Sequence, residues 1–242
     1  MRMRPSLFVS DLHLSPVRAG MTEAFGRLLE GPALQSEAVY ILGDLFDYWA
    51  GDDDLAEPFN AGVVAKLAAS TALGANIFFM RGNRDFLIDE DFALITGVQI
   101  LDEPTLIKIG DERTVLVHGD TLCTDDTEYQ QFRAEVRDPK WKRRFLATPI
   151  EERRRQIEGM RAKSESEKQK KSIATMDVNA AAVTAMFRSC RAGLLIHGHT
   201  HLPGTHELTV DSRRCVRRVL PDWYERASGL SCDDTGIQTV EF

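Results

Sequence analysis

Three histidines at alternate positions follow an apolar run in the segment Leu194-Leu195-Ile196-His197-Gly198-His199-Thr200-His201. Alternate residues of an extended strand project to the same side, so an extended backbone here lets His197, His199 and His201 converge on one point. Imidazole is the commonest side-chain metal ligand near neutral pH. Because three of the chain's six histidines lie within five residues, we predict that this stretch binds a metal ion.

Further metal-capable side chains follow short apolar runs that we predict to be strands. These runs occupy residues 6–10, 38–42, 76–80 and 113–117, the last in a hairpin with 105–109. The side chains that follow them are Asp11 and His13, Asp44, Asn83, and His118. Ligands of open α/β sheets bind beyond the carboxyl ends of the strands. We therefore expect these side chains to meet at one rim of the fold.

Two metal ions suit this set better than one. The candidate ligands are Asp11, His13, Asp44, Asn83, His118, His197 and His199. Seven groups exceed the needs of one tetrahedral ion, and a carboxylate such as Asp44 has two oxygens to share. Oxygen and imidazole ligands without thiolate suit Mn, Fe or Zn. Two such ions acidify a bridging water and clamp an in-line displacement at phosphorus.

Arg84 follows the candidate ligand Asn83 directly and cannot bind metal itself. Its guanidinium is suited to meet the charge that develops on phosphoryl oxygens. The alternative is an ordinary surface arginine paired with Asp85. We assign catalysis to Arg84, Asn83 and Asp44.

The composition predicts one α/β domain over residues 1–242 with an insertion. The chain has 242 residues, 43% of them hydrophobic, and a net charge of −7, which disfavours non-specific binding to nucleic acid. Four scattered cysteines without a CxxC pair are expected to be reduced. Further helices are predicted over 21–30, 59–73 and 176–188, and strands over 205–210, 215–219 and 236–242. The run Asp52-Asp53-Asp54 is interpreted as a solvated loop.

Residues 125–172 interrupt the strand pattern and are predicted to be a helical cap. Residues 133–171 contain 14 Lys or Arg against 7 Asp or Glu, in contrast to the acidic chain as a whole. This contrast favours a lid whose basic side binds phosphates and whose apolar side binds a hydrophobic group. An amphipathic helix pair with a solvated basic face is the plainer alternative.

The ordered motifs resemble those of the calcineurin-like metallophosphoesterases. That family's pattern of Asp-x-His, Gly-Asp, Gly-Asn-His or a variant, His, and Gly-His-x-His reads here as Asp11-Leu12-His13, Gly43-Asp44, Gly82-Asn83-Arg84, His118 and Gly198-His199-Thr200-His201. The resemblance implies a β-sandwich flanked by helices, with a dinuclear centre on one edge. It also implies one metal on Asp11, His13, Asp44 and His199, and a second on Asp44, Asn83, His118 and His197.

The longer stretches 10–14, 43–49, 82–86 and 118–126 are similar to the branch of this family that acts in lipid A biosynthesis. The resemblance implies hydrolysis of UDP-linked diacylglucosamine to UMP and the diacylglucosamine 1-phosphate. It further implies a manganese-dependent enzyme at the cytoplasmic face of the inner membrane. We expect a monomer, and the basic insertion favours attraction to anionic lipid headgroups. The implied substrate contacts are Asn83, Arg84, Asp126, Ser164, Lys168, Lys171 and His197.

An amphiphilic substrate also needs an apolar trough. The side chains available to line it are Trp49, Phe86, Leu87, Tyr129, Phe132, Phe145, Ile157 and Met160. The alternative for each is simple packing of the lid on the core.

Rival functions on the same centre are a nuclease, a cyclic-nucleotide phosphodiesterase or a protein phosphatase. A nuclease needs a broad positive groove, whereas the positive charge here is confined to one insertion. A metal-binding scaffold without catalysis is a rival of another class. The presence of Asn83, Arg84 and His118 argues against it.

Overall fold

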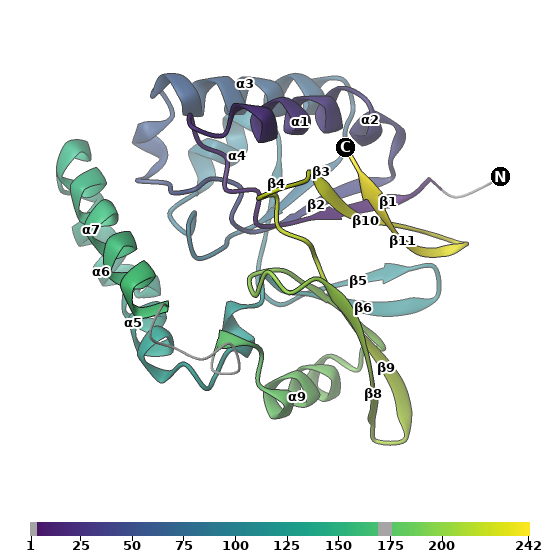
Figure 1. Ribbon diagram of the computed structural model, residues 1–242. Coiled ribbons are helices and arrows are strands. Elements are labelled where there is room, and N and C mark those ends of the chain that lie inside the picture. Colours follow the sequence, from purple (N-terminus) through teal and green to yellow (C-terminus); the bar gives the residue numbers. More distant parts are fainter. Residues whose placement is uncertain (1–3, 169–175) are drawn as a thin grey trace.

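The computed structural model describes residues 4–168 and 176–242, which form four main layers (Figure 1). Two β-sheets stack in the centre, and helices cover the outer face of each sheet. The helices α5 to α7 stand beside this sandwich instead of covering a sheet. The predicted α/β sandwich flanked by helices is confirmed.

The first sheet is parallel in its centre. Its strand order is β11-β10-β1-β2-β3-β4, with parallel pairing from β1 through β4 and antiparallel pairing at β10 and β11. Parallel strands are buried on both faces, which explains their nearly continuous apolar sequences. The strands are β1 (Ser6–Val9), β2 (Ala38–Leu42), β3 (Ile77–Met80), β4 (Gln99–Leu101), β10 (Ser228–Asp233) and β11 (Gly236–Glu241).

The second sheet has the strand order β5-β6-β7-β9-β8. Strands β6, β7 and β9 pair in parallel, and antiparallel hairpins complete both edges. The carboxyl ends of β6 and β7 therefore lie at one edge. The strands are β5 (Thr105–Ile109), β6 (Glu112–Leu116), β7 (Leu194–His197), β8 (Gly204–Val210) and β9 (Arg213–Val219).

Apolar side chains fill the three spaces between the layers. Phe8 and Ile196 belong to the cluster between the sheets, Phe25 to the cluster beneath α1 and α3, and Phe187 to the cluster between α9 and the second sheet. All four of these side chains are fully buried. The covering helices are α1 (Ala19–Glu30), α2 (Pro32–Gln35), α3 (Pro58–Ala72), α4 (Glu90–Thr96) and α9 (Ala180–Cys190).

The backbone bends sharply where the strands end. Asp11, His13 and Asp44 have positive φ values of 55°, 45° and 54°, which are uncommon for residues other than glycine and cluster at functional sites. The loops also press closely together, because a Cβ on Gly82 would lie 2.1 Å from Asp44 Oδ1, and one on Gly198 would lie 2.1 Å from Ser10 Oγ. These glycines allow the strand ends of both sheets to meet at one edge.

Three helices form the region beside the sandwich. They are α5 (Thr127–Arg137), α6 (Pro139–Leu146) and α7 (Ile150–Lys168). The side chain of Asp126 caps α5 and that of Asp138 caps α6. Aspartate is one of the residues preferred at this position, because its carboxylate accepts hydrogen bonds from the free backbone N–H groups. Among the described residues, none of the helices combines the length and the apolar character needed to span a bilayer.

The structure differs from the sequence expectations at several elements. The helix predicted from Met176 begins at Ala180, because Asn179 caps it through the N–H groups of Ala181 and Ala182. Strands β4 and β10 and helix α4 were not anticipated.

The interpretation of Asp52-Asp53-Asp54 as a solvated loop is wrong. These residues form a 3-10 turn. Asp52 accepts hydrogen bonds from Trp49 Nε1 and from the N–H of Phe92, whereas Asp54 is 2% exposed and pairs with Arg154.

Candidate metal centre and substrate pocket

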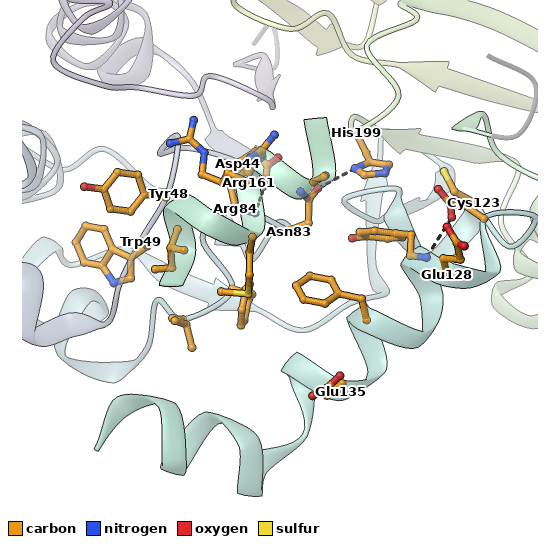
Figure 2. A pocket seen from close by; sticks show the side chains of 18 of the residues that line it. Asp44, Tyr48, Trp49, Asn83, Arg84, Cys123, Glu128, Glu135, Arg161 and His199 are labelled. Atoms are coloured by element: carbon orange, nitrogen blue, oxygen red, sulfur yellow. Dashed lines mark hydrogen bonds between the residues drawn. The ribbon is translucent and has the colours of Figure 1, made fainter. Parts of the chain in front are cut away.

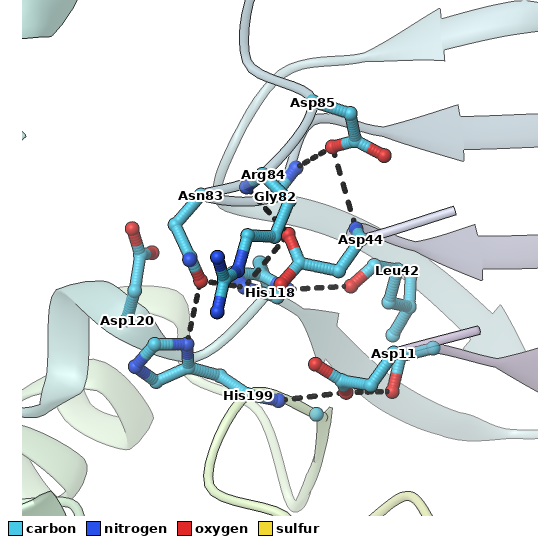
Figure 3. Close-up of polar contacts among 12 residues, drawn as sticks. Asp11, Leu42, Asp44, Gly82, Asn83, Arg84, Asp85, His118, Asp120 and His199 are labelled. Carbon is cyan, nitrogen blue, oxygen red and sulfur yellow. Dashed lines mark hydrogen bonds and ion pairs between the residues drawn. The ribbon is translucent and has the colours of Figure 1, made fainter. Parts of the chain in front are cut away.

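Two groups of ligand-type side chains converge at the shared edge of the sheets, one of Asp11, His13 and His201 and one of Asn83, His118 and His199. Figure 3 shows Asp11, Asp44 and the group around Asn83. In the first group, His201 Nε2 lies 3.3 Å from Asp11 Oδ1 and 3.4 Å from His13 Nε2. The described residues offer the buried atoms Asp11 Oδ1 and His13 Nδ1 no hydrogen bond of good geometry. A carboxylate oxygen and two imidazole nitrogens that converge in this way suit a divalent cation.

The second group centres on Asn83. Its Oδ1 lies 3.0 Å from His118 Nε2 and 2.9 Å from His199 Nδ1. His118 Nδ1 lies 2.8 Å from the carbonyl oxygen of Leu42, so Nδ1 carries a proton and Nε2 is the nitrogen that faces the cluster.

Asp44 lies between the two groups. Its carboxylate is 3.9 Å from His13 Nε2 through Oδ2 and 3.8 Å from His118 Nε2 through Oδ1. The backbone N–H of Arg84 donates to Oδ1 at 2.8 Å. The structure thus gives Asp44 the position of a shared ligand.

His197 does not take the place that the sequence suggested. Strand β7 ends at His197, and the positive φ of 68° at His199 and 54° at His201 shows that the backbone is no longer extended. The alternation rule therefore fails. The ring of His197 lies 2.8 Å from the oxygen of Gly198 through Nδ1 and 3.3 Å from Arg217 Nη1 through Nε2. His199 and His201 occupy the two groups, whereas His197, expected as a ligand, lies outside both of them and off the pocket.

Two buried carboxylates, Asp11 and Asp44, dominate the electrostatics of His118. Burial opposes ionisation of Asp11, but the close contact with His201 and the nearby His118 hold the pKa of this carboxyl well below its usual range. Burial also opposes a charged His118, yet Asp44 and Asp11 raise its pKa to about 9. Burial, together with Asp11, raises the pKa of Asp44. The two carboxylates thus supply negative potential for a cation.

The Asp85 side chain stabilises the loops that carry Asp44 and Asn83. It is fully buried, and it accepts N–H groups from Gly82 at 2.8 Å, Leu45 at 2.7 Å and Asp44 at 3.3 Å. It therefore braces the loops of Asp44 and Asn83 through their backbone. Sequence reasoning considered Asp85 only as a partner for Arg84 and missed this role.

A pocket of about 700 Å³ joins the cluster to an apolar trough (Figure 2). Its polar end includes His13, Asp44, Asn83, His199 and His201. All eight side chains expected to hold acyl chains line the pocket, namely Trp49, Phe86, Leu87, Tyr129, Phe132, Phe145, Ile157 and Met160. Trp49, Leu87 and Phe145 also belong to the core, so packing and lining coexist at these residues.

Most of the expected substrate contacts lie on this pocket. Asn83, Arg84, Asp126 and Ser164 line it, whereas His197 does not. Lys171 and the side chain of Lys168 lie outside the described residues.

The family model described as calcineurin-like phosphoesterase matches residues 4–203. The chain belongs to the calcineurin-like phosphoesterase family. A UDP-2,3-diacylglucosamine hydrolase from Aromatoleum aromaticum is 50% identical over 96% of this chain and 94% of its own length. The protein of the same name from Aliivibrio fischeri is 41% identical over 94% of each chain.

A solved archaeal phosphodiesterase shares the fold of this phosphoesterase. It has a TM-score of 0.50 and 14% identity, over 98% of this chain and 99% of its own. At this identity the likeness concerns the fold alone.

Helix α7 of this phosphoesterase is tied to the loop after β2 by ion pairs. Arg153, Arg154 and Arg161 of α7 pair with Asp53, Asp54 and Asp47, respectively. These arginines hold α7 against that loop, so the expectation that the basic side of the insertion serves phosphates does not extend to Arg153 and Arg154. Arg161 lines the pocket at its rim.

Proposed function

We propose that this phosphoesterase hydrolyses the pyrophosphate bond of UDP-2,3-diacylglucosamine and releases UMP and 2,3-diacylglucosamine 1-phosphate, also called lipid X. The observation that carries the proposal is the single pocket that joins a polar ligand cluster to an apolar trough. The substrate has the same division between a charged pyrophosphate and two acyl chains. The names of relatives at 41% and 50% identity over nearly the whole chain support this substrate, which belongs to lipid A biosynthesis.

Two divalent ions, which we propose to be Mn²⁺, fit the residues present. Asp11, His13, Asp44 and His201 would hold one ion, and Asp44, Asn83, His118 and His199 the other. The unpartnered Asp11 Oδ1 and the oxygen and imidazole donor set support this assignment. When bound, such ions lower the pKa of water and neutralise charge on phosphoryl oxygens.

The protein's own residues position the substrate. Figure 2 shows the side chain of Arg84 beside Asp44 and Asn83, where its guanidinium can meet the charge that develops on the pyrophosphate. Asp126 and Ser164 line the same pocket and offer polar groups to the sugar. The acyl chains would lie against Phe132 and the other apolar lining residues, which exclude water from that end.

The apolar end of the pocket separates this proposal from the rivals. A nuclease or a cyclic-nucleotide phosphodiesterase gains nothing from an apolar trough, because its substrates carry no acyl chains. We also propose that residues 125–172 act as a lid within a single domain.

We further propose that the protein acts as a monomer bound peripherally to the cytoplasmic face of the inner membrane. Helix α6 exposes Lys140, Arg143 and Arg144, with Leu146 beside them. Each basic residue near anionic lipid contributes about 1 kcal/mol. Co-sedimentation with anionic vesicles should fall as salt rises, and its absence at low salt would exclude membrane binding.

The test is UMP release from UDP-2,3-diacylglucosamine with and without added Mn²⁺. Wild type should release UMP only with the metal, whereas Asp44→Asn and Arg84→Ala should be at least about 100-fold slower. Glu207→Gln serves as the control, because Glu207 forms an exposed pair with Arg214 on the far hairpin. A folded, metal-loaded wild type that releases no UMP would overturn the proposal, as would full activity in Asp44→Asn.

A further inference from the structure

Helix α5 contacts both the substrate pocket and the loops that carry the metal-ligand candidates. Phe132 lines the pocket. Tyr129, Arg133 and Arg137 follow one another at intervals of four residues, so they share one face of the helix. This face touches the loops that hold His118 and Asn83.

Arg133 binds both carboxylates that flank the loop of His118. Its Nε donates to Asp120 Oδ2 at 2.7 Å, and its Nη2 donates to Glu103 Oε2 at 3.0 Å. The other oxygen of Glu103 accepts the backbone N–H of His118 at 2.8 Å. Tyr129 also donates its hydroxyl to Asp120 Oδ2 at 2.8 Å. One guanidinium therefore fixes the position of the segment that presents His118.

This arrangement depends on the charge of Arg133. Asp120 is fully buried, and the side chain of Glu103 is 11% exposed. Removing the cation would leave two like charges facing each other away from water. Glu103 would then be driven from its place, and the backbone of His118 would lose its anchor.

Arg137 holds the second loop. Its Nη2 donates to the carbonyl oxygen of Gly82 at 2.7 Å, and Gly82 directly precedes Asn83. The guanidinium also packs over the ring of Phe86, 5.3 Å from the ring centroid. The same helix face thus reaches both loops of the second ligand group.

We propose that Arg133 and Arg137 are positioning residues of the metal centre, through which helix α5 of the lid sets the ligands His118 and Asn83. This inference rests on the proposed metal centre. Mutation of a residue that orients a metal ligand typically lowers the metal affinity about 10- to 100-fold. The lid would then determine how tightly the centre binds metal, in addition to covering the pocket.

The test is the Mn²⁺ affinity of the full-length protein, measured by titration calorimetry, together with the electron paramagnetic resonance spectrum of the bound ion. Arg133→Gln should bind Mn²⁺ at least about tenfold more weakly and change the spectrum, whereas Arg133→Lys should recover part of the affinity. Arg154→Gln is the matched control, because it breaks an ion pair between the lid and Asp54 without touching a ligand loop. Its Mn²⁺ affinity should equal that of wild type.

Equal Mn²⁺ affinity in Arg133→Gln, Arg137→Gln and wild type would overturn the inference and leave the proposed function intact. Equal losses in Arg133→Gln and Arg154→Gln would also overturn it, because they would show a general effect of loosening the lid. If circular dichroism shows that Arg133→Gln does not fold, Arg137→Gln decides, since it removes a bond to a backbone carbonyl and a contact with the Phe86 ring but leaves no buried carboxylate without its cation. A wild type without Mn²⁺ affinity would refute the metal centre itself.

Discussion

Arg153 offers the sharpest test of how helix α7 is held against the loop after β2. It lies on α7, yet its side chain is only 1% exposed. It donates hydrogen bonds to the carbonyl oxygens of Ala50 at 2.6 Å and Thr148 at 3.0 Å, and to Asp53 Oδ1 at 2.8 Å. Arg153→Met keeps an unbranched apolar stem but removes every one of these bonds.

The loss of stability in Arg153→Met depends on whether each hydrogen-bond partner of Arg153 can bond to water instead. A hydrogen bond to a charged group contributes about 1.5–3 kcal/mol, and an unsatisfied buried carbonyl costs about 1–3 kcal/mol. The side chain of Asp53 is 59% exposed and can return to water, whereas Ala50 is fully buried. We therefore expect Arg153→Met to lower the free energy of unfolding by about 3–4 kcal/mol.

Urea denaturation of Arg153→Met beside Arg155→Met measures this difference. Arg155 lies on the same helix, its side chain is 74% exposed, and it pairs with Glu152 at 2.5 Å. Such surface pairs contribute about 0–1 kcal/mol. The reasoning fails if the two variants lie within about 1 kcal/mol of each other.

Three further predictions concern the lid, the centre and the pocket. Burial and the nearby Arg81 and Arg137 lower the pKa of Lys142 to about 8 from 10.5. Between pH 8 and 10.5, Lys142 is therefore protonated in the unfolded chain but neutral in the folded protein. The free energy of unfolding should rise by about 1–2 kcal/mol over this range, after allowance for the partial exposure of Lys142. Lys142→Met should abolish this rise in pH-dependent denaturation, and an unchanged slope would contradict the assignment. The pKa of His118 is raised to about 9, so Mn²⁺ must displace a proton to bind this side chain. Calorimetry should therefore show the Mn²⁺ affinity rising by up to about tenfold per pH unit from pH 7 to 9. An affinity that does not change with pH would count against His118 as a ligand. Phe132 is 40% exposed on the pocket, so Phe132→Arg should slow turnover of the diacyl substrate, and wild-type turnover would remove it from the acyl site.

The sequence predicted the fold and the edge where the candidate ligands meet, because both follow from local rules. Residues 38–42 form β2 within the predicted bounds, since an apolar run of that length suits a strand buried on both faces. The positions of Asp11, Asp44 and His118 follow in turn, since parallel strands bring their carboxyl ends to one edge.

The features that depend on distant contacts could not be predicted in this way. The choice between His197 and His201 depends on backbone bends at His199 and His201, which the alternation of a strand does not foresee. Asp54 looked solvated because its partner Arg154 lies 100 residues further along the chain. The Gly-His-x-His motif was the available signal for His201, because it contains His199 and His201 but not His197.

The most direct test of the central claim compares UMP release from UDP-2,3-diacylglucosamine and from UDP-glucosamine without acyl chains. The claim is that one substrate occupies both the ligand cluster and the apolar trough. Burial of even four methylene groups contributes about 3 kcal/mol, so kcat/KM should be at least about 100-fold higher for the diacyl substrate. Equal kcat/KM values would show that the trough does not serve the reaction, and would contradict the account.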